Sequence, residues 1–147
     1  MEVMNLAEFH KGMTFPEYTY TLSEDIIKNF ILGVEETNPL YTDADYAKKA
    51  GFGCLVVPPT TISLYVTPSR VLKTIDKKTP PGLIQAGQRY EFHRPIRLGD
   101  TVTVKAVVED VTQKKGRDFV SIKGEAYNPD GQKAAVSIIT VIWPAQS

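Results

Sequence analysis

Apolar and polar residues alternate along most of the second half of the chain. Residues 101–112 carry valine or alanine at every second position from 102 to 108, and residues 119–127 alternate in the same way. A period of two is typical of a strand that buries one face and exposes the other. Turn signals, among them Asn-Pro-Asp-Gly, separate these segments from their neighbours. The pattern predicts four consecutive antiparallel strands, at residues 83–95, 101–112, 119–127 and 133–143.

The first half of the chain predicts one strand followed by short helices. Residues 13–21 are rich in Thr, Tyr and Phe, which favour a strand. Residues 21–24 have capping-box spacing, and apolar residues then recur at helical spacing up to Gly33. Asp43 is a suitable N-cap for a further helix over residues 44–50.

Residues 61–72 form a longer apolar segment. Its β-branched residues would also permit a strand, but its length and the preceding prolines favour a mostly buried helix, which Pro68 would kink. The element order therefore predicts an α+β fold in which a five-stranded antiparallel sheet wraps around a long central helix, the hot-dog arrangement. No repeat, low-complexity tract or linker interrupts the chain, so residues 1–147 are expected to form one domain. The exposed sheet edges predict pairing with a second subunit.

Composition narrows the classes of partner. The chain has 17 basic and 17 acidic residues, and this balance argues against nucleic acid and against an anionic membrane surface as partners. No stretch approaches the roughly 20 apolar residues of a membrane span. The N-terminal segment lacks the apolar run of a signal peptide, and the single cysteine fits a reducing compartment. A cytoplasmic location is expected.

The segment Glu36-Thr37-Asn38-Pro39-Leu40-Tyr41-Thr42-Asp43 holds the main candidates for chemistry. Adding water to an enoyl thioester requires a base, an acid and donors for the thioester oxygen. An Asp followed five residues later by a His would form such an acid/base pair. Here Glu36 stands at the first position and Tyr41 at the second.

The histidines and the cysteine are weaker candidates. His10, His93 and Cys54 have no metal-ligand spacing, so no metal site is expected. His93 is more typical of a hydrogen-bonded strand residue, and Cys54 of a small buried thiol. Arg94 and its neighbours, Arg89 and Arg97, have two interpretations: contacts with the phosphates of a coenzyme A or carrier-protein arm, or surface charges paired with nearby acids.

Two runs of residues together resemble the MaoC-like (R)-specific hydratase/dehydratase superfamily. The first joins residues 38–43, Gly51-Phe52-Gly53 and Val57-Pro58-Pro59-Thr60, and the second is residues 90–102. The resemblance covers roughly residues 12–143 and keeps the order and separation of both signatures. It departs from the active pattern because Glu36 replaces the catalytic Asp and Tyr41 the catalytic His.

These departures are more similar to non-catalytic members of the superfamily. Tyr41 and the Pro-Pro-Thr run resemble the N-terminal half of two-hot-dog dehydratases, the FAS1-like dehydratase domain, and the non-catalytic subunit of mycobacterial 3-hydroxyacyl-thioester dehydratases. A tyrosine has a pKa of about 10 and is a poor proton shuttle at neutral pH. Glu36 displaces its carboxylate by one methylene, and an error of about 1 Å can cost on the order of a hundredfold in rate. Pro58 and Pro59 also remove two backbone donors where an oxyanion would bind.

The resemblance implies a subunit of a 3-hydroxyacyl-thioester dehydratase or enoyl-thioester hydratase. This chain would shape the acyl tunnel while a partner hot dog supplies the Asp/His dyad. The acyl thioester would be carried on coenzyme A or acyl carrier protein, and no cofactor is expected. Glu36 and Tyr41 occupy the catalytic positions without an expected proton-transfer role, and the expected substrate-binding residues are Asn38, Pro39, Pro59, Thr60 and Arg94.

Three alternatives remain open at the level of sequence. One is an independently active homo-oligomeric hydratase that uses Glu36, with Tyr41 as a hydrogen-bond donor. Another is a non-enzymatic hot dog that binds acyl thioesters. A hot-dog thioesterase is less favoured, because the matched signatures are those of hydratases.

Overall fold

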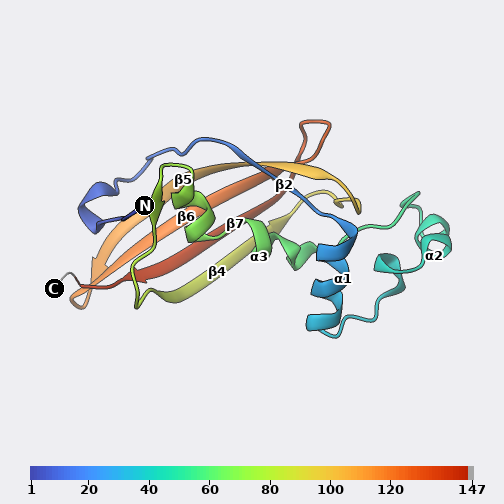
Figure 1. Ribbon diagram of the computed structural model, residues 1–147, viewed down its shortest axis with the longest axis horizontal. Coiled ribbons are helices and arrows are strands. Elements are labelled where there is room, and N and C mark those ends of the chain that lie inside the picture. The colour runs from blue at the N-terminus through green and yellow to red at the C-terminus, as the bar shows by residue number, and fades with distance from the viewer. Residues whose placement is uncertain (146–147) are drawn as a thin grey trace.

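The computed structural model describes residues 1–145, in which a five-stranded antiparallel sheet with the order β2-β5-β6-β7-β4 dominates (Figure 1). A separate two-stranded parallel ribbon joins β1 to β3. The strands are β1 (Glu2–Val3), β2 (Tyr18–Thr21), β3 (Lys77–Lys78), β4 (Ile84–Phe92), β5 (Thr101–Lys114), β6 (Arg117–Tyr127) and β7 (Lys133–Trp143). The helices are α1 (Glu24–Gly33), α2 (Ala44–Lys49), α3 (Ile62–Tyr65) and α4 (Pro68–Lys73), with 3-10 turns η1 (Leu6–Glu8), η2 (Pro39–Tyr41) and η3 (Pro59–Thr61).

The alternating segments form the strands that their pattern predicts. On β5, the apolar residues at positions 102, 104, 106 and 108 are all buried, whereas their neighbours face outward. The β6 residues Val120, Ile122 and Ala126 lie on the same buried face of the sheet. The four consecutive antiparallel strands are therefore confirmed, with β5 and β6 extending further into their shared hairpin than the sequence pattern indicates.

The prediction of a long central helix over residues 61–72 is wrong. The segment divides into η3, α3 and α4, separated by an extended connection at Val66 and Thr67. Pro68 explains the break, because a proline disfavours helical backbone in the residue before it and donates no hydrogen bond. The new helix starts afresh: the Thr67 hydroxyl accepts a hydrogen bond from the Arg70 N–H at 3.2 Å.

The broken helical segment still lies against the buried face of the sheet. Ile62, Tyr65 and Val66 belong to one apolar cluster, and Val71 and Leu72 belong to a second; both clusters include residues of β5, β6 and β7. The segment comes very near the sheet at Gly124 of β6, where an added Cβ atom would lie 2.5 Å from Val66 Cγ1. A glycine at this position therefore lets the extended connection approach the strand.

Helices α1 and α2 project beyond one end of the sheet (Figure 1). Ser23, rather than Thr21, caps α1 by accepting a hydrogen bond from the Ile26 N–H, which places the cap two residues later than the predicted box. Asp43 caps α2 as predicted, by accepting from the Tyr46 N–H at 3.1 Å. Within residues 1–145, no helix is long and apolar enough to cross a membrane.

Candidate functional site

The loop from Glu36 to Asp43 uses its polar side chains to hold its own backbone. One Glu36 carboxylate oxygen accepts hydrogen bonds from the N–H groups of Thr37 and Asn38, both at 2.9 Å. The Asn38 side-chain oxygen accepts from the Leu40 N–H at 3.0 Å, which starts the η2 turn through Pro39. Glu36 therefore acts as a loop-closing acid in this geometry, and its carboxylate does not line the neighbouring pocket.

Tyr41, at the end of η2, does line that pocket. Partial burial raises the pKa of its phenol, and the negative charge of nearby Glu36 raises this pKa further. Tyr41 therefore remains protonated over a wider pH range than a free tyrosine. It can donate a hydrogen bond into the pocket but is poorly suited to exchanging protons near neutrality.

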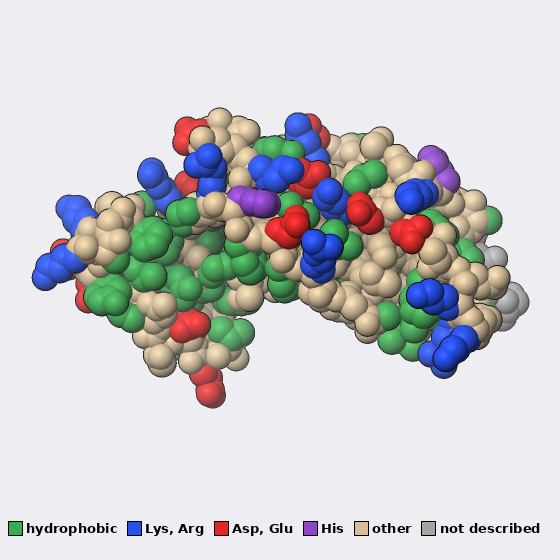
Figure 2. All heavy atoms as spheres, turned by 180° about the vertical axis from the view of Figure 1, so that it is seen from behind, with side chains coloured by type: hydrophobic (Ala, Val, Ile, Leu, Met, Phe, Trp, Pro, Cys, Tyr) green, Lys and Arg blue, Asp and Glu red, His purple; other side chains and the backbone are tan. Residues whose placement is uncertain are grey.

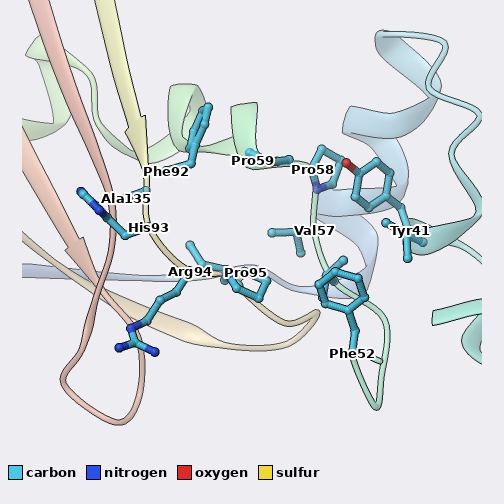
Figure 3. A pocket seen from close by; sticks show the side chains of 13 residues that line it. Tyr41, Phe52, Val57, Pro58, Pro59, Phe92, His93, Arg94, Pro95 and Ala135 are labelled. Carbon is cyan, nitrogen blue, oxygen red and sulfur yellow. The ribbon is translucent and has the colours of Figure 1, made fainter. Parts of the chain in front are cut away.

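The pocket, of about 280 Å³, lies between the end of the sheet and the projecting α1–α2 region (Figure 3). One wall is formed by Phe92 and the chain that follows β4, and the other by Tyr41, Phe52 and the Pro58-Pro59 pair. Most of the surface is apolar, and the two prolines offer no N–H group. The pocket is suited to covering a hydrocarbon chain more than to stabilising charge.

The predicted site residues are only partly brought together. Tyr41, Pro59 and Arg94 line the pocket, and Figure 3 shows the Arg94 guanidinium pointing away from Phe92 and Pro59. Glu36, Asn38, Pro39 and Thr60 lie outside the lining. The His93 ring also points away from the pocket centre, although its residue contributes to the wall.

Sequence reasoning missed two aromatic residues of the pocket lining, Phe52 and Phe92. Both residues lie inside the two signature runs, but nothing in their spacing indicates that they line one pocket. Phe52 stands between Gly51 and Gly53, whose positive φ angles of 94° and 76° bend the loop on either side of it. Flanking glycines of this kind are the one signal that could have drawn attention to Phe52.

Other chemistry is sparse in the described part of the chain. Within residues 1–145, no three His, Cys, Asp or Glu side chains are grouped closely enough to hold a metal ion. Cys54 is a partly buried free thiol. Apart from Tyr41, His93 and Arg94, the residues that line the pocket are apolar.

Residues 9–136 match the family model described as "FAS1-like, dehydratase domain region". A "UPF0336 protein" of Streptomyces avermitilis is 26% identical over 145 residues, with 95% of each chain covered. Among solved structures, the HadBC (3R-hydroxyacyl-ACP dehydratase) complex from Mycobacterium tuberculosis matches with a TM-score of 0.79 at 22% identity, covering 90% of this chain and 96% of that one. The (R)-hydratase from A. caviae matches with a TM-score of 0.74 at 21% identity, covering 93% and 98%. These two structural likenesses establish the hot-dog-like fold.

Proposed function

Since this chain belongs to the family of FAS1-like dehydratase domains, we propose that it is the non-catalytic hot-dog subunit of a 3-hydroxyacyl-thioester dehydratase or enoyl-thioester hydratase. The proposal rests on the different surroundings of two side chains in the loop from Glu36 to Asp43. Tyr41 faces the pocket as a protonated phenol, while the Glu36 carboxylate binds the N–H groups of Thr37 and Asn38. This arrangement supports a chain in which neither position transfers protons.

The apolar pocket is the proposed binding surface for the acyl thioester. Its volume of about 280 Å³ is close to the lower end of typical ligand sites, and its wall has few polar groups. Phe92, Pro58 and Pro59 contribute apolar rings to this lining (Figure 3). The thioester would be carried on coenzyme A or an acyl carrier protein, and the reaction requires no cofactor.

The partner in this proposal is a second hot dog that carries the Asp/His pair. In dehydration, a base removes the proton from the carbon beside the thioester carbonyl, and an acid protonates the 3-hydroxyl, which leaves as water. Both groups would come from the partner. The likeness to a protein solved as the HadBC complex supports pairing between two hot-dog chains.

Two exposed features of this chain support such pairing. Strand β4 is an edge strand, and near its end Tyr90 and Phe92 stack at 5.7 Å, with Phe92 49% exposed. Figure 2 shows apolar side chains gathered over the end of the molecule that carries α1 and α2, where Leu32 and Val34 are 67% and 55% exposed. Exposed edges and apolar patches of this kind are common at protein interfaces.

The test compares enoyl-thioester hydration by the purified chain with hydration by the chain co-expressed with a hot-dog partner that carries Asp and His. The expected result is no turnover by the chain alone and turnover by the complex, which Glu36→Gln leaves unchanged. Glu35→Gln is the matched control, because Glu35 is the neighbouring exposed acid. Turnover by the chain alone that disappears in Glu36→Gln and survives in Glu35→Gln would instead establish an independent hydratase. Thioester binding without turnover in any pairing would establish a binding module.

A further inference from the structure

A second pocket adjoins the apolar one and shares part of its wall. Phe52, Val56, Arg94 and Pro95 line both pockets. The second pocket, of about 360 Å³, has a mainly polar lining that adds Arg97 and the turn between β6 and β7. The two pockets thus form an apolar end and a polar end of one surface.

Arg94 connects the two ends. Figure 3 shows the side chain leaving the wall of the apolar pocket and carrying its guanidinium away from Phe92. Arg97 is a second arginine in the lining of the polar pocket. Across residues 1–145, no carboxylate forms an ion pair with either arginine, whereas Arg89 on β4 is paired with Glu91 at 3.5 Å. Two arginines without an internal partner in one pocket are suited to an external oxyanion, above all a phosphate.

Two carboxylates also line the polar pocket and limit its charge. Asp100 closes the turn before β5, where one carboxylate oxygen accepts a hydrogen bond from the Arg97 N–H at 3.0 Å. Asp130 lies in the β6–β7 turn, which the Asn128 side chain holds by accepting from the Asp130 N–H at 3.0 Å. With two positive and two negative side chains, the pocket suits a single phosphate group and does not suit a polyanion such as nucleic acid.

We propose that Arg94 and Arg97 bind the phosphate of the phosphopantetheine arm that carries the acyl thioester, while the rest of the ligand lies along the apolar pocket. This inference rests on the proposed thioester-binding function and adds the group that anchors the carrier. The same phosphate occurs in coenzyme A and in the prosthetic arm of an acyl carrier protein, so the shared chemistry is a phosphate ester at the end of a pantetheine chain.

Isothermal titration calorimetry with three hexanoyl thioesters separates the contributions. Hexanoyl-pantetheine lacks the phosphate, hexanoyl-4′-phosphopantetheine carries it, and hexanoyl-CoA adds the nucleotide. The expected result is a gain in affinity of roughly 10-fold from the phosphate, because charge-assisted hydrogen bonds are stronger than neutral ones. The Arg94→Ala/Arg97→Ala variant should lose this gain and bind hexanoyl-pantetheine as the unsubstituted chain does. Arg117→Ala, an exposed arginine in the β5–β6 hairpin at the opposite end of the sheet, is the matched control and should keep the gain.

The outcomes distinguish this inference from the proposed function. Equal affinity for the first two ligands, or a phosphate gain that survives in the double arginine variant, would overturn the inference and leave the thioester-binding function standing. Absence of binding by all three ligands would overturn both. Where the gain depends on the two arginines, tighter binding of hexanoyl-CoA than of the phosphopantetheine thioester favours coenzyme A as the source. Equal binding shows that recognition ends at the phosphate, as binding of a carrier-protein arm requires.

Discussion

Gly124→Ala should destabilise the fold because it places a methyl group where the broken helical segment meets the sheet. The added Cβ would lie 2.5 Å from Val66 Cγ1, 3.1 Å from Cγ2 and 3.4 Å from Cβ. Carbon atoms in favourable contact are about 3.5–4.0 Å apart. Rotation of Val66 to another staggered rotamer would still leave a γ carbon in one of these two close positions, so part of the strain must be relieved by the backbone.

The magnitude follows from two opposing effects. Overpacking a buried site typically costs about 1–3 kcal/mol. Replacing glycine within a strand removes some backbone freedom from the unfolded chain, which offsets about 0.5–1 kcal/mol. Because Val66 is 1% exposed and enclosed by the apolar cluster, the first effect dominates. The expected loss in the free energy of unfolding is about 1–2 kcal/mol.

Urea denaturation measures this loss, with Gly87→Ala as the matched control. Gly87 is also a strand glycine without a positive φ angle, but its added Cβ would lie at an ordinary 3.7 Å from Thr140 Cβ. Gly87→Ala should therefore change the midpoint little or raise it. Combining Gly124→Ala with Val66→Ala should recover about 1 kcal/mol relative to the sum of the single substitutions, because the two side chains compete for one space.

A Gly124→Ala variant whose urea midpoint equals or exceeds that of the unsubstituted chain, at an unchanged denaturant slope, would refute this explanation. Strict additivity of the two substitutions would be equally damaging, since it would mean that Val66 is not the group displaced. A similar loss in Gly87→Ala would show that the effect belongs to strand glycines in general and does not arise from this contact.

Three further predictions concern the site and its surroundings. Tyr41→Ala should weaken hexanoyl-pantetheine binding by roughly 10-fold in calorimetry, whereas Tyr41→Phe should keep the apolar contact and most of the affinity. Since burial raises the Tyr41 pKa, the affinity of the unsubstituted chain should stay constant as pH rises to about 9. Asp43→Ala should lower the free energy of unfolding by about 1 kcal/mol, because the N-cap of α2 is lost. Asp45→Ala, in the first turn of the same helix, should lower it by less. A hydrogen bond from Lys133 lowers the Glu125 pKa below 4.5, so the stability that this pair contributes is present above that pH and is lost as pH falls through the folded-state pKa. Glu125→Gln should therefore be less stable at neutral pH and decline less steeply in acid, as urea midpoints at several pH values would show.

Most of the sheet could be predicted because strand burial repeats every second residue. The alternation on β5 and β6 reports directly which side chains face the core, and the turn residues between strands limit the register. The helical segment could not be read in the same way. Its apolar residues are buried whether the backbone is one helix or two, so the decisive information was local: Pro68 and the β-branched pair Val66-Thr67 before it.

The sequence predicted those site residues whose role depends only on the neighbouring part of the chain. Tyr41 and Asp43 could be assigned to a pocket and a helix cap because their side chains act at their own place in the chain. That Phe52 and Phe92 line the same pocket depends on how the loop after α2 approaches the end of β4, which is a tertiary arrangement. Glu36 shows the converse, since a carboxylate at a catalytic position of the motif is occupied by the loop backbone.

The prolines link the fold of this chain to its proposed role. Pro58 and Pro59 start the η3 turn and place flat apolar rings in the pocket wall, and at the same positions they remove the N–H groups that an enolate-like oxygen would require. Thr61 uses both its N–H and its hydroxyl to bind the Pro58 carbonyl, at 3.0 and 2.7 Å, so both donors of this residue are occupied as well. A wall built in this way would hold an apolar chain through van der Waals contact and offers few hydrogen-bond donors to a developing negative charge. These residues therefore fit the proposed role of a pocket wall, in which a partner subunit would supply proton transfer and oxyanion stabilisation.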